Sequence, residues 1–318
     1  MLSEDLRRRI AALNRGALKH VSRPEKSDHT ARKAVPEGFP SSDRRQEEHP
    51  PVPKIERSPS WMPPSDAHQR IVSLDEVVRG QVIEEENGCF LFIERSLGDL
   101  WKEAEIFQQR YRSVVLDGRT YMEAGALRGD LRNLTEWDRR TMLYLDIETT
   151  GFSGSPLFLV GLMHHAENGL VIKQLFARDY SEEQHLLKYL IKLMDSFQVL
   201  VSFNGKAFDL PYLRDRSVIH RVRFRHDLFH LDLLHEARRR WRERLPNCRL
   251  QTLERVICHR VRMEDIPGSE IPQVYHDFVR TGNAARIRDV LHHNALDLIT
   301  MSEVLVFMLE GKGPGDSV

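Results

Sequence analysis

The sequence predicts an α/β fold built on a mixed sheet. Three successive apolar runs with short turns between them are typical of antiparallel strands, and they lie at 142–148, 157–164 and 170–176. A helical pattern over 182–196 then precedes a fourth apolar run over 198–203, which permits a parallel crossover. We expect a fifth, edge strand to end at Asp232. Further helical patterns lie at 207–216, 233–243, 250–258, 271–280 and 284–310. These observations predict a five-stranded sheet with flanking helices.

The chain divides by composition into four parts. Residues 1–68 hold nine of the fifteen prolines and many charges, so we expect a disordered segment that could serve as a docking arm for protein partners. Residues 69–139 contain two strand patterns around Asn87-Gly88, a strong hairpin signal, and form a small β-containing accessory segment. Residues 140–311 form the main domain and residues 312–318 a flexible tail. The accessory segment could be a substrate-guiding wall or a structural brace.

Two acids lie near the end of the strand 142–148. Side chains on a strand alternate between its faces, so Asp146 and Glu148 share one face while Ile147 points to the other. At a separation of about 4 Å and an effective dielectric constant of about 20, their repulsion is worth about 4 kcal/mol. A divalent cation removes that cost, and carboxylate oxygens suit Mg²⁺ or Mn²⁺. The alternative is an exposed strand face on which both acids are solvated.

A further candidate acid follows the strand 198–203. Asn204-Gly205 breaks this strand, and the helical pattern that follows places Asp209 in the first turn of a helix beyond the strand's carboxyl end. An acid at that position can simply complement the helix dipole, and Asn204 can simply be a turn residue.

The last helix carries the fourth candidate acid. His293 and Asp297 are four residues apart and therefore share one helix face. Apolar neighbours indicate that Asp297 faces something buried. The alternative is a His–Asp surface pair, which would stabilise the helix by only a few tenths of a kcal/mol.

In this order and spacing the motifs resemble the DEDD (DnaQ-like) 3′–5′ exonuclease superfamily on the ribonuclease H fold, and more closely its YprB-like ribonuclease-H-like branch in bacteria. The resemblance covers residues 140–308 and rests on the segments Leu145–Gly151, Ser202–Pro211, Cys248–Glu254, Asp265–Gly268 and His293–Asp297. It implies that four acids are catalytic and bind two Mg²⁺ or Mn²⁺ ions, and these match Asp146, Glu148, Asp209 and Asp297. The implied activity is removal of nucleotides from DNA or RNA in the 3′-to-5′ direction.

The resemblance also implies a catalytic base and a substrate site. Superfamily members with a catalytic histidine usually place it five residues before the last acid, and those with a tyrosine place it four before. Here His292 and His293 fill both positions. Helix geometry favours His293, but His292 becomes the better base if the helix opens between them. The implied contacts to the terminal nucleotide are the backbone of Thr149, Thr150 and Gly151 and the side chain of Phe152, although Phe152 could equally be core and Thr150-Gly151 an ordinary turn. Asn204 could contact the substrate or form a hydrogen bond near Asp209.

The distribution of charge favours a nucleic-acid partner. Basic and acidic residues both number 47, but residues 214–262 hold fourteen arginines against six acids. A basic surface of this kind suits a phosphate backbone. The alternative is a solvated helix face, and we expect Trp241 within it to lie in the core rather than to stack on a base.

Other features exclude several classes of protein and leave two alternatives to the exonuclease open. No stretch is apolar enough to span a membrane, and no signal-peptide core is evident. Three widely spaced cysteines without a C-x-x-C indicate neither a zinc ribbon nor a disulfide framework, which fits the reducing cytoplasm. Besides the exonuclease, the chain could be an endonuclease on the same fold or a non-catalytic nucleic-acid-binding protein. A cluster of repelling carboxylates argues against the last of these.

Overall fold

A seven-stranded sheet forms the centre of this computed structural model, which describes residues 70–85, 88–118, 127–151, 154–224, 227–262 and 265–316. The strands are β1 (Gln81–Glu85), β2 (Gly88–Ser96), β3 (Met142–Thr149), β4 (Leu157–Ala166), β5 (Gly169–Phe176), β6 (Val199–Ser202) and β7 (Phe229–Asp232). Four predictions lie outside the described residues: the disorder of residues 1–68, the hairpin turn at Asn87, the role of Phe152 and the end of the flexible tail.

The sheet is mixed, as the sequence predicts, and its strand order is β1-β2-β5-β4-β3-β6-β7. Strands β3, β4 and β5 pair antiparallel, whereas β3 pairs parallel with β6 and β6 parallel with β7. The expected number of five strands is wrong, because β2 of the accessory segment pairs antiparallel with β5 and brings β1 with it. Without β2, strand β5 would expose a row of unpaired backbone groups, and proteins cover such an edge.

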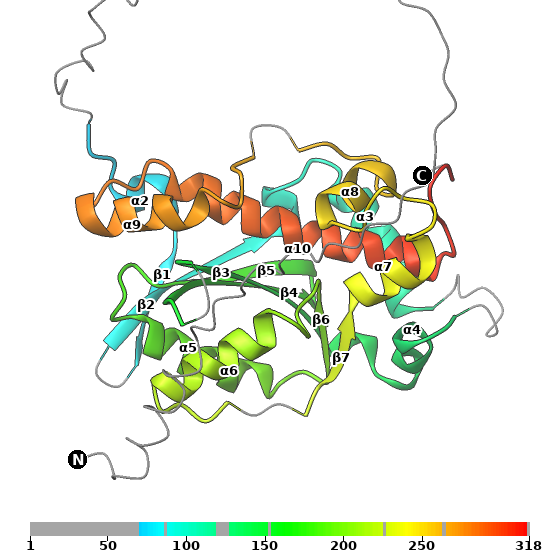
Figure 1. The fold of residues 1–318 in the computed structure, drawn as a ribbon, viewed down its shortest axis with the longest axis horizontal. Helices are drawn as coiled ribbons and strands as arrows, with labels where there is room; N and C mark the ends of the chain where they lie inside the picture. Colours follow the sequence, from blue (N-terminus) through cyan, green and yellow to red (C-terminus); the bar gives the residue numbers. More distant parts are fainter. Residues whose placement is uncertain are drawn as a thin grey trace, which may run out of the picture. The chain divides into compact units, whose positions relative to one another are not determined.

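Helices cover both faces of the sheet (Figure 1). Helices α8 (Leu250–Val256), α9 (Ile271–Thr281) and α10 (Ile287–Leu309) lie on one side, and α5 (Glu183–Met194) and α6 (Asp209–Ile219) lie on the other. The remaining α-helices are α2 (Leu74–Val77), α3 (Ala104–Tyr111), α4 (Asp130–Asn133) and α7 (Leu233–Trp241). Short 3₁₀ turns occur at Leu97–Asp99, Leu134–Glu136 and Arg139–Thr141, and a π-helical turn at Arg112–Leu116.

The alternation of side chains along β3 decides which face carries the acids. Met142 and Tyr144 belong to the core cluster that contains the C-terminal half of α10, whereas Leu143 and Leu145 belong to the cluster under α5 and α6. Because the strand continues with the same period of two, Asp146 and Glu148 face α10.

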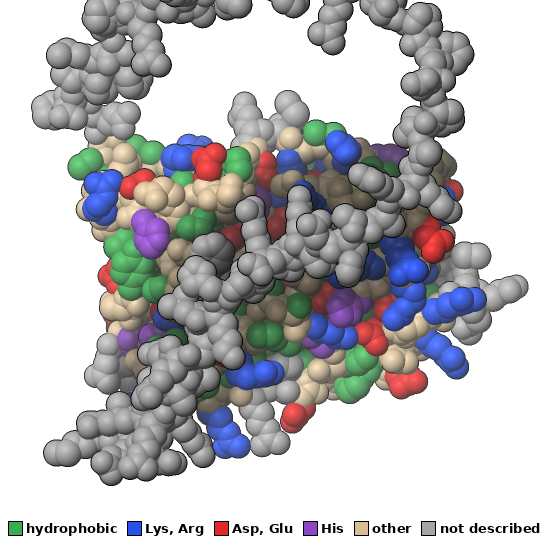
Figure 2. Space-filling model, viewed as in Figure 1, with side chains coloured by type: hydrophobic (Ala, Val, Ile, Leu, Met, Phe, Trp, Pro, Cys, Tyr) green, Lys and Arg blue, Asp and Glu red, His purple; other side chains and the backbone are tan. Residues whose placement is uncertain are grey.

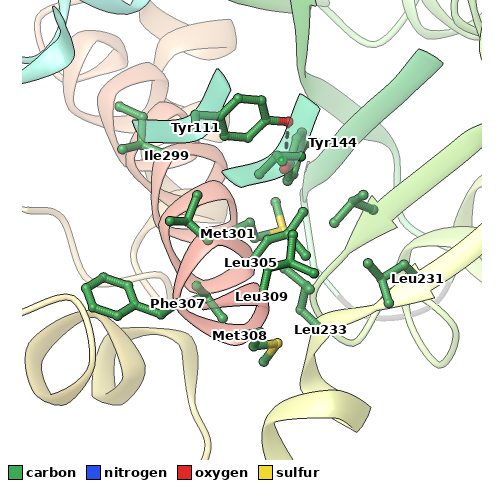
Figure 3. Close-up of a cluster of buried hydrophobic side chains, with 14 of the residues drawn as sticks. Tyr111, Tyr144, Leu231, Leu233, Ile299, Met301, Leu305, Phe307, Met308 and Leu309 are labelled. Carbon is green, nitrogen blue, oxygen red and sulfur yellow. Dashed lines mark hydrogen bonds between the residues drawn. The ribbon is translucent and has the colours of Figure 1, made fainter. Parts of the chain in front are cut away.

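The core beneath α10 anchors that helix to the sheet. The hydroxyl groups of Tyr111 and Tyr144 are 3.0 Å apart and hydrogen-bonded, and Met301 and Leu305 of α10 belong to the same buried cluster (Figure 3). Trp241 is fully buried in the same cluster, which confirms that it is a core residue. Fully burying a large apolar side chain contributes about 1.5–3 kcal/mol, so this cluster fixes α10 and the residues it carries.

The described part of the chain contains no helix with both the length and the apolar character needed to cross a membrane. Its three cysteines, Cys89, Cys248 and Cys258, are free thiols.

Candidate active site

The sheet topology brings the predicted acids to one edge. Strands β3, β6 and β7 are parallel neighbours, so their carboxyl ends meet at the same edge of the sheet. Asp146 and Glu148 lie in the C-terminal half of β3, and Asp209 is the first residue of α6, shortly after β6. Asp297 reaches the same edge from α10.

Asp232, at the end of β7, has a structural role at this edge. Its carboxylate accepts hydrogen bonds from the backbone N–H groups of Asn204 (2.9 Å), Lys206 (3.0 Å) and Leu234 (3.1 Å). It therefore caps the start of α7 and holds the turn after β6, where Asn204 adopts a left-handed conformation with φ 67°.

A relay of side chains across the sheet holds Asp146. The Asn294 amide of α10 donates to the Asp146 carboxylate at 2.8 Å and accepts from Gln174 of β5 at 2.9 Å. Arg95 of β2 donates in turn to Gln174 at 2.5 Å. Gly161 lies opposite Asp146 on β4, and any side chain there would overlap the Asn294 amide. The accessory hairpin thus braces the site.

The four acids share one electrostatic environment. Burial, followed by the charges of the other three acids, raises the pKa of Asp146 well above its ordinary value. Burial raises the pKa of Glu148 to about 8, against the opposing charge of His293. Burial also raises the pKa of Asp209 to about 7, although backbone N–H groups stabilise its charged form. Ionising this cluster therefore costs the folded chain free energy, and a bound cation would offset that cost.

Asp297 is neutralised by an arginine from the loop between α8 and α9. The Arg262 guanidinium is 6% exposed and forms an ion pair with Asp297, and it also pairs with Glu254 (2.5 Å) and Asp265 (3.1 Å). Within the residues described, no group of three or more His, Cys, Asp or Glu side chains is arranged to hold a metal ion. The donor set nevertheless suits a divalent cation, because hard carboxylate oxygens with raised pKa values gain most from one.

The two candidate histidines have different surroundings. His293 is buried, and its Nδ1 lies 2.9 Å from Asp265 Oδ1 while its Nε2 lies 3.7 Å from Asp297 Oδ2. Burial alone would lower the pKa of His293, but the hydrogen bond with Asp265 and the charges of the neighbouring acids raise it. Burial lowers the pKa of His292. This geometry favours His293 as the proton acceptor, in line with its place on the helix face of Asp297.

A cavity of about 500 Å³ opens beside Asp146 and Asp297. Asn204 also lines it, together with Phe203, Leu234, Arg238, Asn247, Cys248, Arg249 and Leu250. Of the predicted substrate contacts, Asn204 therefore lies next to the acids.

The turn after β3 uses its polar groups internally. The Thr149 hydroxyl donates to the Gly151 carbonyl at 3.0 Å, and the Thr150 N–H and hydroxyl both donate to the Pro156 carbonyl at 3.0 and 3.1 Å. The His276 ring lies 3.3 Å from the Thr150 carbonyl. Hydrogen bonding thus fixes the backbone of this turn.

Sequence reasoning missed three residues at the site. Asn294 and Arg262 contact the candidate acids, and Asp265 contacts His293. Asp265 lies in a motif that carried the family resemblance, and Asn294 lies three residues before Asp297, so both positions offered a signal. Arg262 was counted only as part of the basic segment.

Comparison with known proteins assigns the class. Residues 143–309, more than half of the chain, match a family model described as the RNase_H superfamily, and the chain belongs to that superfamily. It is 30% identical over 177 residues to the uncharacterized protein YprB of Bacillus subtilis (strain 168), which confirms the resemblance to YprB-like ribonuclease-H-like proteins. That match covers 54% of this chain and 43% of YprB, so the chain spans less than half of its relative's length.

Among solved structures, the chain is similar to the family B DNA polymerase from the hyperthermophilic archaeon Pyrobaculum calidifontis. The TM-score is 0.41 at 19% sequence identity, and the match covers 52% of this chain and 24% of the polymerase.

Proposed function

We propose that this protein is a metal-dependent nuclease, and specifically a 3′–5′ exonuclease that hydrolyses phosphodiester bonds of DNA or RNA. The observation that carries the proposal is the gathering of four mutually repelling carboxyl groups beside a cavity, in a chain of the RNase H superfamily. A structural or scaffolding role would give no reason to keep acids whose burial raises their pKa values so far.

Asp146, Glu148, Asp209 and Asp297 would hold two Mg²⁺ or Mn²⁺ ions, which supply an activated water and stabilise the leaving oxygen when they are bound. Arg262 keeps Asp297 neutralised in the absence of ions, and Asn294 orients Asp146 through its amide. Asp146 and Asp297 both line the same cavity.

His293 would accept the proton of the attacking water at Nε2. Its Nδ1 faces the Asp265 carboxylate, so in the neutral ring Nδ1 carries the proton and Nε2 is left free to accept one. Asp265 then stabilises the imidazolium that forms. Asn204, at the rim of the cavity, would donate to the substrate backbone.

The test is a digestion panel of single- and double-stranded DNA and RNA, each labelled at the 5′ or the 3′ end, with Mg²⁺ or Mn²⁺. We expect stepwise loss from the 3′ end, and Asp146→Ala should abolish cleavage while binding is largely kept. Internal cuts would assign an endonuclease instead. If wild-type protein cleaves none of these substrates with either ion, the proposal is wrong.

A further inference from the structure

The arginines of residues 214–262 fall into two groups. The first group is engaged within the fold: five pair with carboxylates and two donate to backbone carbonyls, namely Arg216, Arg239, Arg242, Arg260, Arg262, Arg240 and Arg244. Arg238 and Arg249 belong to the second group. Both are exposed, and their guanidinium groups have no hydrogen-bond or ion-pair partner within the described part of the chain. Only arginines of this second kind are free to bind an anion.

Arg238 and Arg249 line the same 500 Å³ cavity as Asp146 and Asp297. Arg238 also lines a second cavity of about 500 Å³ along α7, among the further arginines Arg239, Arg240, Arg242 and Arg244. The two cavities therefore meet at Arg238. Figure 2 shows Lys and Arg side chains gathered on the side of the molecule where α7 lies. Arg238 therefore links the cavity beside the acids to the arginine-rich surface along α7.

A third cavity, of about 580 Å³, is lined by Arg255, Arg260 and Arg262. The guanidinium groups of Arg260 and Arg262 are already paired with Glu254 and other carboxylates, so their charge is neutralised within the protein. Arg255 is exposed there, but none of the four acids lines that cavity. Arg238 and Arg249, in contrast, share their cavity with Asp146 and Asp297.

We propose, resting on the proposed nuclease function, that Arg238 and Arg249 form a phosphate-binding wall that directs one strand of nucleic acid from the acids across α7. The planar guanidinium group binds phosphate oxygens in pairs, which suits it to this role. A volume near 500 Å³ is that of a small-molecule site, about 300–1,000 Å³, so the cavity accepts a nucleotide or two of a single strand and not a duplex. The apolar side chains of Phe203 and Leu250 line the same cavity and can contact bases.

The wall is tested by binding of single-stranded DNA and RNA oligonucleotides, labelled with fluorescein, to Asp146→Ala protein at several salt concentrations. Each phosphate contact on a single strand contributes about −0.7 to the slope of log K against log salt. The double substitution of Arg238→Gln and Arg249→Gln in this background should therefore make the slope less steep by about 1.4. Arg255→Gln is the matched control, because Arg255 is an exposed arginine on α8 that lines the other cavity. It should leave the slope unchanged. Circular dichroism melting verifies that each variant is folded.

The outcomes separate the wall from the nuclease function. If the double variant keeps the slope and affinity of its parent while wild-type protein cleaves, the wall is wrong and the nuclease stands. If the salt dependence of the double variant becomes less steep as predicted but wild-type protein cleaves nothing, Arg238 and Arg249 bind nucleic acid and the nuclease function is wrong. If no oligonucleotide is bound or cleaved, both are wrong.

Discussion

Replacing Asp209 with asparagine is expected to stabilise the protein when no divalent ion is present. The Asp209 side chain is 4% exposed, and burial raises its pKa from 3.8 to about 7. Each pH unit of that difference is worth about 1.4 kcal/mol, so ionising Asp209 costs the folded state up to about 4 kcal/mol at pH 7. Loss of the favourable charge at the start of α6 removes about 0.3–1 kcal/mol. We expect a net gain of about 2–4 kcal/mol in the free energy of unfolding.

The gain should depend on pH in a defined direction. Between the unfolded pKa of 3.8 and the folded pKa of about 7, the unfolded chain has lost the Asp209 proton while the folded chain keeps it. Stability therefore falls as pH rises through this window, and the gain from Asp209→Asn grows until it levels off above the folded pKa.

Urea unfolding in EDTA, followed by circular dichroism near pH 5 and near pH 7, measures this gain. Asp215→Asn is the control, because Asp215 is an exposed acid on the same helix, and it should change stability by no more than about 0.5 kcal/mol. Mn²⁺ should stabilise the wild type more than Asp209→Asn. A variant that is less stable than wild type near pH 7, or whose gain is the same at both pH values, would refute the reasoning.

Three further substitutions probe the neighbours of the acids. Arg262→Gln removes the cation paired with Asp297 and one of the partners of Glu254 and Asp265, so it should cost about 3–5 kcal/mol in urea unfolding, and Mn²⁺ should restore more stability than in wild type; an equal response to Mn²⁺ contradicts the account. Asp265→Asn should lower the pKa of His293, and an imidazole NMR titration in EDTA that shows no decrease would count against this pairing. Gly161→Ala should displace Asn294 and cost about 1–3 kcal/mol; an unchanged melting temperature would show that the amide is not held there.

Local periodicity in the sequence was sufficient to predict the elements that carry the acids. The alternation along β3 placed Asp146 and Glu148 on one face, and the structure shows that face turned toward α10. The spacing of four residues placed His293 beside Asp297, and in the structure His293 Nε2 lies 3.7 Å from Asp297 Oδ2. Both inferences depend only on the geometry of a single strand or helix.

Partners distant in sequence could not be predicted in this way. The pairing of β2 with β5 depends on which sheet edge is left uncovered, and no pattern within residues 69–139 records that edge. Arg262 lies 35 residues before Asp297 in a segment that reads as a basic surface, yet its side chain is buried against carboxylates. Composition counts such an arginine as available for nucleic acid, whereas the structure shows that its charge is neutralised within the fold.

Anomalous diffraction from crystals soaked in Mn²⁺ tests the central claim most directly, because it locates the ions themselves. The account predicts Mn²⁺ density in contact with Asp146, Glu148, Asp209 and Asp297, with the Arg262 guanidinium displaced from Asp297. Saturating Mn²⁺ that leaves no density among these four side chains would contradict it.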